Sequence, residues 1–366
     1  MSNDAPMIEA LGLAKRFPVG GGGLLRPRRL LHAVDGVDLD IRRGETFAIV
    51  GESGCGKSTL ARLLMRLLDP TEGTIRIDGK DISAAQGPAL KSLRRDVQFI
   101  FQDPFSSLNP RLTVARLVGE PLEAHHPDLN AAQRRDRVAA LLRQVGLRPE
   151  QMDRYPHEFS GGQRQRIGIA RALASGPRVL IGDEPVSALD VSVQAQVVNL
   201  LSDLREELGL TLVVIAHDLA IIRQMSDRIA VMYLGRVVET GPTDQIFETP
   251  RHPYTRALLA AIPGPEGGGG AALGGETPSP IDPPSGCHFR TRCPYAIDAC
   301  AAARPPLEAT GTGAQVACIR WREIGDATDA LPDPAPRSAG AETRFRLYRD
   351  AIAAGAATTT PIQQET

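Results

Sequence analysis

The stretch GESGCGKST, residues 51–59, is the most informative part of this sequence. It fits the pattern glycine, four residues, glycine, lysine, then serine or threonine, which is typical of phosphate-binding loops. The apolar run TFAIV (46–50) precedes it and the helix-like run TLARLLMRLL (59–68) follows it, which disfavours a glycine-rich turn that fits by accident. Backbone N–H groups and the positive end of a helix dipole would then surround phosphate oxygens. We therefore expect Lys57 to neutralise β- and γ-phosphate charge and Ser58 to ligate Mg²⁺.

Two further apolar runs, RVLIG (178–182) and TLVVIA (211–216), also end in polar residues. Continuous apolar runs of this length suit strands of a parallel sheet that is covered on both faces. In open α/β sheets the ligand lies beyond the carboxyl ends of the strands, which is where GESGCGKST, DEP and HD fall. The sequence therefore predicts an α/β fold with a phosphate-loop (P-loop) core and its chemistry at one edge of the sheet.

The rest of the chain divides by composition. Residues 111–175 are poor in strand signals and rich in Ala, Leu, Arg and Gln, which predicts an inserted helical subdomain over about residues 103–177. The Gly/Pro-rich passage 264–286 indicates a linker between a nucleotide-binding domain, residues 1–263, and a small cysteine-rich C-terminal extension, residues 287–322. Residues 323–366 are expected to form a poorly ordered tail with one short helix.

Overall charge and the N-terminal residues limit the classes of function. The 366 residues contain 42 Lys and Arg against 43 Asp and Glu, a net charge of −1, so no global attraction to nucleic acid or to an anionic membrane is expected. The start, MSNDAPMIEALGLAKRF, does not have the pattern of a signal peptide, and no run is long enough to span a bilayer. We therefore expect a cytosolic chain, in which clustered cysteines are metal or cluster ligands rather than disulfides.

Two adjacent carboxylates, Asp183 and Glu184, follow the run RVLIG. Asp183 can hold Mg²⁺ directly or through water, and Glu184 can orient or polarise the water that attacks the γ-phosphate. For this pair alone, a solvated acidic turn at the end of a core strand would be the better interpretation. Its expected place beside the phosphate loop favours the catalytic one.

A second anion site is predicted in EFSGGQRQRIGIARAL (158–173), where Ser160 and two glycines begin a helix. The N–H groups at a helix N-terminus bind anions. An ordinary serine cap after a turn explains the pattern equally well. One nucleotide rarely needs two such sites from one chain, so the residues alone leave the two interpretations open.

Together with FQDP (101–104), SALD (187–190) and His217, these motifs resemble the ATP-binding cassette of ABC transporters over about residues 7–250. In that family two cassettes pack head to tail, so that the SGGQ segment of one closes over the ATP held by the other. The resemblance implies that Gln102 senses Mg²⁺ and the attacking water while it links to the membrane subunit. It also implies that His217 contacts the γ-phosphate and that Phe17 stacks on adenine; otherwise these would be a surface histidine and a core or loop phenylalanine.

The resemblance assigns Lys57, Gln102, Glu184 and His217 to catalysis and Ser58, Gln102 and Asp183 to Mg²⁺. The residues it assigns to nucleotide binding are Phe17, Gly51, Ser53, Gly54, Cys55, Gly56, Lys57, Ser58, Thr59, Gln102, Ser160, Gly161, Gly162, Gln163 and Asp183. Cys55 is interpreted as a small filler residue of the loop. The signature begins with Phe159 where the family usually has leucine, which leaves the N–H donors and the serine unchanged.

Four of the five cysteines and the single tryptophan lie within residues 286–321. The spacing of Cys287, Cys293, Cys300 and Cys318 contains no C-x2-C pair, so it indicates only that four thiolates could surround one centre. Free thiols in a small domain are the alternative, which the clustering disfavours. Because the ATP motifs precede the linker, the sequence predicts that nucleotide binding survives the loss of one cysteine.

The segments HPYTRALLAAIPGP (252–265), PSPIDPPSGCHFRTRCPYAIDAC (278–300) and VACIRW (316–321) resemble the C-terminal extension of oligopeptide/dipeptide importer ATPases. GESGCGKST and FQDPFSSLNPR resemble the second of the two ATPase subunits that such importers generally carry. Some members of that family hold a [4Fe-4S] cluster on the matching cysteines. The resemblance therefore favours an iron–sulfur cluster over zinc.

The resemblance implies an ATPase subunit, at the cytoplasmic face of the cell membrane, that energises import of di- or oligopeptides. The implied partners are two membrane permease subunits, a second ATPase subunit in a heterodimer or homodimer, and an extracytoplasmic substrate-binding protein, with no nucleic acid. Nickel, glutathione or a sugar are alternative cargoes. A soluble ABC ATPase acting on DNA or ribosomes fits poorly, because such proteins typically carry two cassettes or long coiled coils in one chain. The cysteine segment could also act as a redox or iron sensor.

Overall fold

The computed structural model describes residues 5–20, 29–261 and 276–325. Its central sheet has eight strands in the order β11-β12-β10-β9-β3-β8-β7-β6. The block from β9 to β6 is parallel, and β10, β12 and β11 continue it in antiparallel fashion. The strands are β3 (Thr46–Val50), β6 (Val97–Ile100), β7 (Val179–Asp183), β8 (Thr211–Ile215), β9 (Arg228–Tyr233), β10 (Arg236–Pro242), β11 (Glu308–Ala309) and β12 (Gln315–Val316).

The three strands predicted from apolar runs are β3, β7 and β8, which confirms the α/β core. Every residue of each is buried, as expected for strands that are covered on both faces. The register of the parallel pairs places Ile49 beside Ile215 and Asp183 beside Ile215. The carboxyl ends of β3, β8 and β7 therefore meet at one edge of the sheet.

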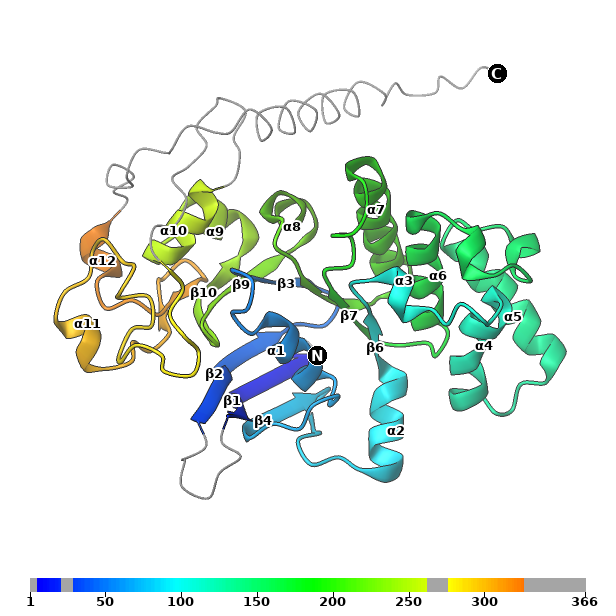
Figure 1. The fold of residues 1–366 in the computed structure, drawn as a ribbon, viewed down its shortest axis with the longest axis horizontal. Coiled ribbons are helices and arrows are strands. Elements are labelled where there is room, and N and C mark those ends of the chain that lie inside the picture. The colour runs from blue at the N-terminus through cyan, green and yellow to red at the C-terminus, as the bar shows by residue number, and fades with distance from the viewer. Residues whose placement is uncertain (1–4, 21–28, 262–275, 326–366) are drawn as a thin grey trace, which may run out of the picture.

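A smaller antiparallel sheet has the order β2-β1-β4-β5. Helix α1 (Lys57–Leu64) lies between the two sheets and contacts β1 and β2 on one side and β7 and β8 on the other (Figure 1). Leu60, Leu63 and Leu64 of this helix join one core cluster with residues of both sheets. The strands of the small sheet are β1 (Ile8–Val19), β2 (Arg29–Ile41), β4 (Glu72–Ile77) and β5 (Lys80–Asp81).

Helices occupy the stretch for which a helical subdomain is predicted: α3 (Pro104–Ser107), α4 (Val114–His125), α5 (Ala131–Gln144) and α6 (Gly161–Leu173). Asn130 caps α5 through a reciprocal pair of hydrogen bonds with Gln133, which satisfies two N–H groups at the start of the helix. These helices and the C-terminal segment lie at opposite ends of the molecule (Figure 1). The remaining helices of the body are α2 (Gly87–Asp96), α7 (Val191–Leu208), α8 (Leu219–Met225), α9 (Thr243–Glu248) and α10 (Pro253–Ala260).

The C-terminal segment, here residues 276–325, packs on the body and differs from the separate module that the Gly/Pro-rich passage predicts. Strand β12 pairs with β10 and so extends the central sheet. Phe289 is buried in the same core cluster as Tyr233, and the N–H group of His32 donates to the carbonyl of Pro280. The segment also holds α11 (Ala299–Ala302) and the short helix α12 (Trp321–Ile324).

Parts of two predicted regions, 264–275 of the linker and 326–366 of the tail, lie outside the described residues. In the three described ranges, no helix is both long enough and apolar enough to pass through a bilayer.

Candidate functional site

The phosphate loop has a backbone that only glycine can follow at two positions. Gly51 has a φ of +150° and Gly56 a φ of +107°, values that residues with a side chain rarely adopt. A Cβ atom at Gly51 would lie 2.2 Å from the carbonyl oxygen of Met232, and one at Gly56 would lie 2.1 Å from that of Ala33. The loop is thus pressed against neighbouring backbone, which fixes its path into α1.

Lys57 and Ser58 begin α1 and hydrogen-bond to different partners. Lys57 is 5% exposed, and its Nζ donates to the carbonyl oxygens of Gly51 at 2.8 Å and Glu52 at 3.0 Å. The Ser58 hydroxyl donates to Asp183 Oδ1 at 2.9 Å, and burial raises the pKa of that carboxyl. The strand end of β7 and the start of α1 therefore bring together a hydroxyl and a carboxylate, which are oxygen ligands of the kind that Mg²⁺ prefers.

Glu184 lies at the centre of a second group of side chains. Its Oε2 accepts a hydrogen bond from Gln102 Nε2 at 2.7 Å and lies 3.3 Å from His217 Nδ1. Its φ is 48°, and its N–H group donates to the carbonyl of Ile215 at 2.9 Å. Non-glycine residues in this left-handed region are uncommon and concentrate at functional sites. The ends of β6, β7 and β8 thus hold one carboxylate between an amide and an imidazole.

The predicted second anion site lies at the start of α6. Ser160 Oγ accepts from the N–H of Gln163 at 3.4 Å, and the N–H of Ser160 donates to Gln163 Oε1 at 3.0 Å. Gly162 packs closely on α7, since a Cβ there would lie 2.3 Å from a methyl carbon of Val193. Within the described part of the chain, no hydrogen bond or ion pair connects these residues to the phosphate loop.

The remaining predicted residues divide into two groups. Ser53 and Gly54 are exposed and Thr59 is half-buried in the first turn of α1, while Cys55 is buried in the core cluster, where burial raises its pKa. Phe17 lies on β1, with Lys15 Nζ 5.2 Å from the centre of its ring. The structure therefore gathers the loop, Asp183, Glu184, Gln102 and His217, and leaves Phe17 and the Ser160–Gln163 segment apart from that network.

Sequence analysis missed a group of contacts around Glu52 in the phosphate loop. The Glu52 carboxylate is paired with Arg292 of the C-terminal segment at 2.8 and 3.0 Å, and its N–H group donates to the Tyr254 hydroxyl at 2.8 Å. The loop motif leaves this position free, and the partners lie about two hundred residues or more away. No local spacing could have revealed them.

The four clustered cysteines line one small cavity together with His252 and Phe289. Burial is the main cause that raises the pKa of Cys293 to about 12 and of Cys318 to about 11, with neighbouring thiols adding to it. Among the described residues, no set of three or more His, Cys, Asp or Glu side chains has the arrangement needed to hold a metal ion. The structure therefore brings the four thiols to one cavity but not into the arrangement of a metal site.

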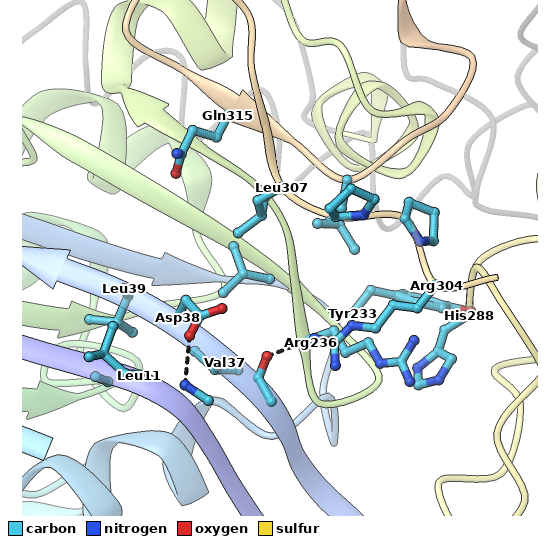
Figure 2. A pocket seen from close by; sticks show the side chains of 18 of the residues that line it. Leu11, Val37, Asp38, Leu39, Tyr233, Arg236, His288, Arg304, Leu307 and Gln315 are labelled. Atoms are coloured by element: carbon cyan, nitrogen blue, oxygen red, sulfur yellow. Dashed lines mark hydrogen bonds between the residues drawn. The ribbon is translucent and has the colours of Figure 1, made fainter. Parts of the chain in front are cut away.

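A separate cavity of about 780 Å³ lies between the small sheet and the C-terminal segment. Figure 2 shows Arg236, His288 and Arg304 at one end and Leu11, Leu39 and Asp38 at the other. Arg304 donates to the carbonyl of Gly36 at 2.7 Å, and Arg236 pairs with Asp35 at 2.7 Å. Of the predicted site residues in the described ranges, Cys287 alone lines this cavity, so it is distinct from the phosphate loop.

Comparisons with known proteins match the cassette and the C-terminal segment separately. The family described as "ABC transporter" matches residues 34–187. The family described as "Oligopeptide/dipeptide transporter, C-terminal region" matches residues 238–300.

Similar proteins and solved structures agree with these matches. The oligopeptide transport ATP-binding protein OppF of Salmonella typhimurium is 53% identical over 321 residues, 86% of this chain and 96% of that protein. The probable peptide ABC transporter ATP-binding protein y4tS of Sinorhizobium fredii is 51% identical over 315 residues, 85% of this chain and 89% of that protein. The dimeric ATP-binding cassette MJ0796, solved with ADP and phosphate, is 32% identical with a TM-score of 0.58 and covers 65% of this chain and 99% of its own. The chain therefore belongs to the ABC transporter family, as an ATPase subunit that carries the oligopeptide/dipeptide transporter C-terminal region.

Proposed function

We propose that this chain hydrolyses ATP to energise the import of di- or oligopeptides by an ABC transporter. ATPase activity is supported by one observation: the phosphate loop lies beside Asp183 and Glu184 at the carboxyl edge of β3, β8 and β7. The peptide cargo is supported by the match of residues 238–300 and by the names of the similar proteins.

The geometry supports a division of roles within the ATP site. Lys57, held by two loop carbonyls, would turn its ammonium to β- and γ-phosphate oxygens. Ser58, Asp183 and Gln102 would hold Mg²⁺, whose charge would neutralise phosphate oxygens. Glu184 would accept a hydrogen bond from the attacking water, while Gln102 and His217 keep its carboxylate in place. Phosphoryl transfer depends mainly on such positioning and charge stabilisation.

The Ser160–Gln163 segment supports a head-to-tail pair of cassettes. Ser160 is exposed and the three residues after it are half-buried, and in the described ranges no hydrogen bond or ion pair joins them to the phosphate loop of their own chain. The segment could therefore approach a nucleotide held by a second cassette. The similar cassette MJ0796 is described as dimeric. The partner would be a second homologous ATPase subunit, in a heterodimer or a homodimer, and Phe17 of this chain would stack on the adenine of the ATP that this chain holds.

The proposed assembly adds chains that this protein does not supply. Two membrane permease subunits would form the channel, an extracytoplasmic protein would deliver the peptide, and this chain would attach peripherally at the cytoplasmic face. Cargo is tested by uptake of labelled peptides, nickel, glutathione and sugars into vesicles that contain the assembled transporter. ATP-dependent uptake of peptides supports the proposal, and uptake of another class alone replaces the peptide assignment with that cargo.

We also propose that Cys287, Cys293, Cys300 and Cys318 hold a [4Fe-4S] cluster, with Zn²⁺ as the alternative. The support is that all four thiols line one cavity and are at least half-buried, and that cysteine thiolates are the usual ligands of iron–sulfur clusters. In the described residues the four side chains are near one another but not arranged around a metal position. When bound, such a cluster would supply folding free energy to this segment. Anaerobically purified protein should be brown and contain iron and sulfide at about four each per chain; stoichiometric zinc without iron would leave the zinc alternative.

A further inference from the structure

Arg292 of the C-terminal segment holds the phosphate loop through a two-point ion pair with Glu52. Arg292 Nη1 lies 2.8 Å from Glu52 Oε2, and Nη2 lies 3.0 Å from Oε1. The Arg292 side chain is 4% exposed and that of Glu52 is 24% exposed. Two parallel N–H donors on two carboxylate oxygens fix orientation as well as distance. The pair is therefore specific and largely shielded from water.

Two aromatic residues, Tyr254 and Phe289, lie next to the Glu52–Arg292 pair. The Tyr254 hydroxyl accepts from the Glu52 N–H group at 2.8 Å, and the Tyr254 ring lies 5.4 Å from that of Phe289. The N–H of Arg292 donates to the carbonyl of Phe289 at 2.9 Å, so the guanidinium and the ring belong to one turn of the C-terminal segment. Arg292 thus holds the side chain of Glu52 and Tyr254 holds its backbone, and both partners follow β10 in the chain.

The Glu52–Arg292 pair is connected to Lys57, the side chain expected to bind the phosphates of ATP. Lys57 Nζ donates to the carbonyl of Glu52 at 3.0 Å as well as to that of Gly51, so the residue that Arg292 holds also helps to place the lysine. Glu52 is the single acidic residue of GESGCGKST. Without Arg292, its negative charge would stand unpaired in the loop that binds a polyphosphate, where like charges repel.

We propose that Arg292 is a positioning residue for ATP binding, which neutralises Glu52 and fixes the phosphate loop from the C-terminal segment. The inference rests on the proposed ATP site and assigns that segment a role in it. The affinity of the cassette for ATP therefore depends on the fold of residues 287–300. Turnover of bound ATP, which uses Glu184, depends on it much less.

The test compares the dissociation constant for a fluorescent ATP analogue with KM and kcat for ATP, using the full chain assembled with its partners. Arg292→Met should weaken binding and raise KM by about tenfold or more, because it leaves a partly buried charge unpaired, while kcat changes by less than about twofold. Arg292→Lys keeps the positive charge but not the two-point hydrogen bonding of the guanidinium, and should lose less ATP affinity than Arg292→Met. Arg322→Met removes an exposed pair with Glu308 in the same segment and is the matched control.

A second substitution separates positioning from unfolding. Adding Glu52→Gln to Arg292→Met removes the unpaired charge and should restore most of the affinity, whereas a variant that had only unfolded the segment would gain nothing from it. Unchanged ATP affinity in Arg292→Met, or no recovery in the double variant, overturns the proposal while the proposed function stands. Absence of ATP binding by the unsubstituted protein would instead refute the proposed function.

Discussion

Glu184 is the residue on which turnover is expected to depend. Its carboxylate is held by Gln102 and His217, and its backbone has a positive φ. Replacing one carboxylate oxygen by an amide nitrogen keeps the size and shape of the side chain. Glu184→Gln should bind ATP as the unsubstituted protein does, and should reduce kcat by at least about a hundredfold, because general-base contributions are of that size. Phosphate release in the assembled transporter measures it. Hydrolysis at a near-normal rate would remove Glu184 from this role.

Lys57 is expected to affect ATP binding rather than turnover. Its buried ammonium is held by two carbonyls of the phosphate loop, so Lys57→Ala removes the one cation that the loop itself supplies. ATP affinity should fall by about tenfold or more, as measured by titration with a fluorescent nucleotide. The prediction is wrong if the variant binds ATP normally and is deficient only in turnover.

Within the phosphate loop, position 56 requires glycine both because its φ is positive and because the backbone of Ala33 lies close to it. Gly56 and Gly44 both have positive φ, but a Cβ at Gly44 would meet nothing within 4 Å. Gly44→Ala should therefore lose about 1 kcal/mol of stability from backbone strain. Gly56→Ala adds a clash with the carbonyl of Ala33 and should lose about 1–3 kcal/mol more. Urea unfolding of the two variants compares them directly, and equal losses would show that the close contact can relax.

The elements that sequence analysis predicted are those whose signals are local. β3, β7 and β8 are continuous apolar runs, and the rule that ligands gather at carboxyl ends of parallel strands placed the loop, Asp183 and His217 together. Strands β11 and β12 have two residues each, too few for any periodicity. They form only because β10 offers an edge. The Gly/Pro-rich composition of 264–286 indicated a linker, although in its described part Pro280 and Gly286 accept hydrogen bonds from the body.

The Glu52–Arg292 pair was beyond prediction for a related reason. The two residues are 240 positions apart. The phosphate-loop pattern leaves the residue type at position 52 free, and Arg292 belongs to no motif with fixed spacing. Tertiary packing of Phe289, Tyr233 and Tyr254 brings them together. Such contacts follow from the fold as a whole and carry no local sequence signal.

At the scale of the whole molecule, the cysteine segment and the ATP site should respond together. The sequence predicted that nucleotide binding survives the loss of a cysteine, but residues 287–300 include Arg292, which holds the loop. Cys300→Ser should therefore lower the iron content and also raise the dissociation constant for ATP. Iron analysis and nucleotide titration of the same anaerobic preparation measure both. Loss of iron with unchanged ATP affinity would show that the two sites are independent.

ATP hydrolysis at this site is expected to drive peptide import. The most direct measurement records phosphate release and uptake of a labelled peptide in the same vesicles, which contain the assembled transporter and a peptide-loaded binding protein. Both should rise together when Mg²⁺ and ATP are added to the side that carries this chain, and both should be lost in Glu184→Gln, which still binds ATP. Uptake that continues in Glu184→Gln, or phosphate release that does not increase with the peptide-loaded binding protein, would show that hydrolysis at this site does not drive peptide import.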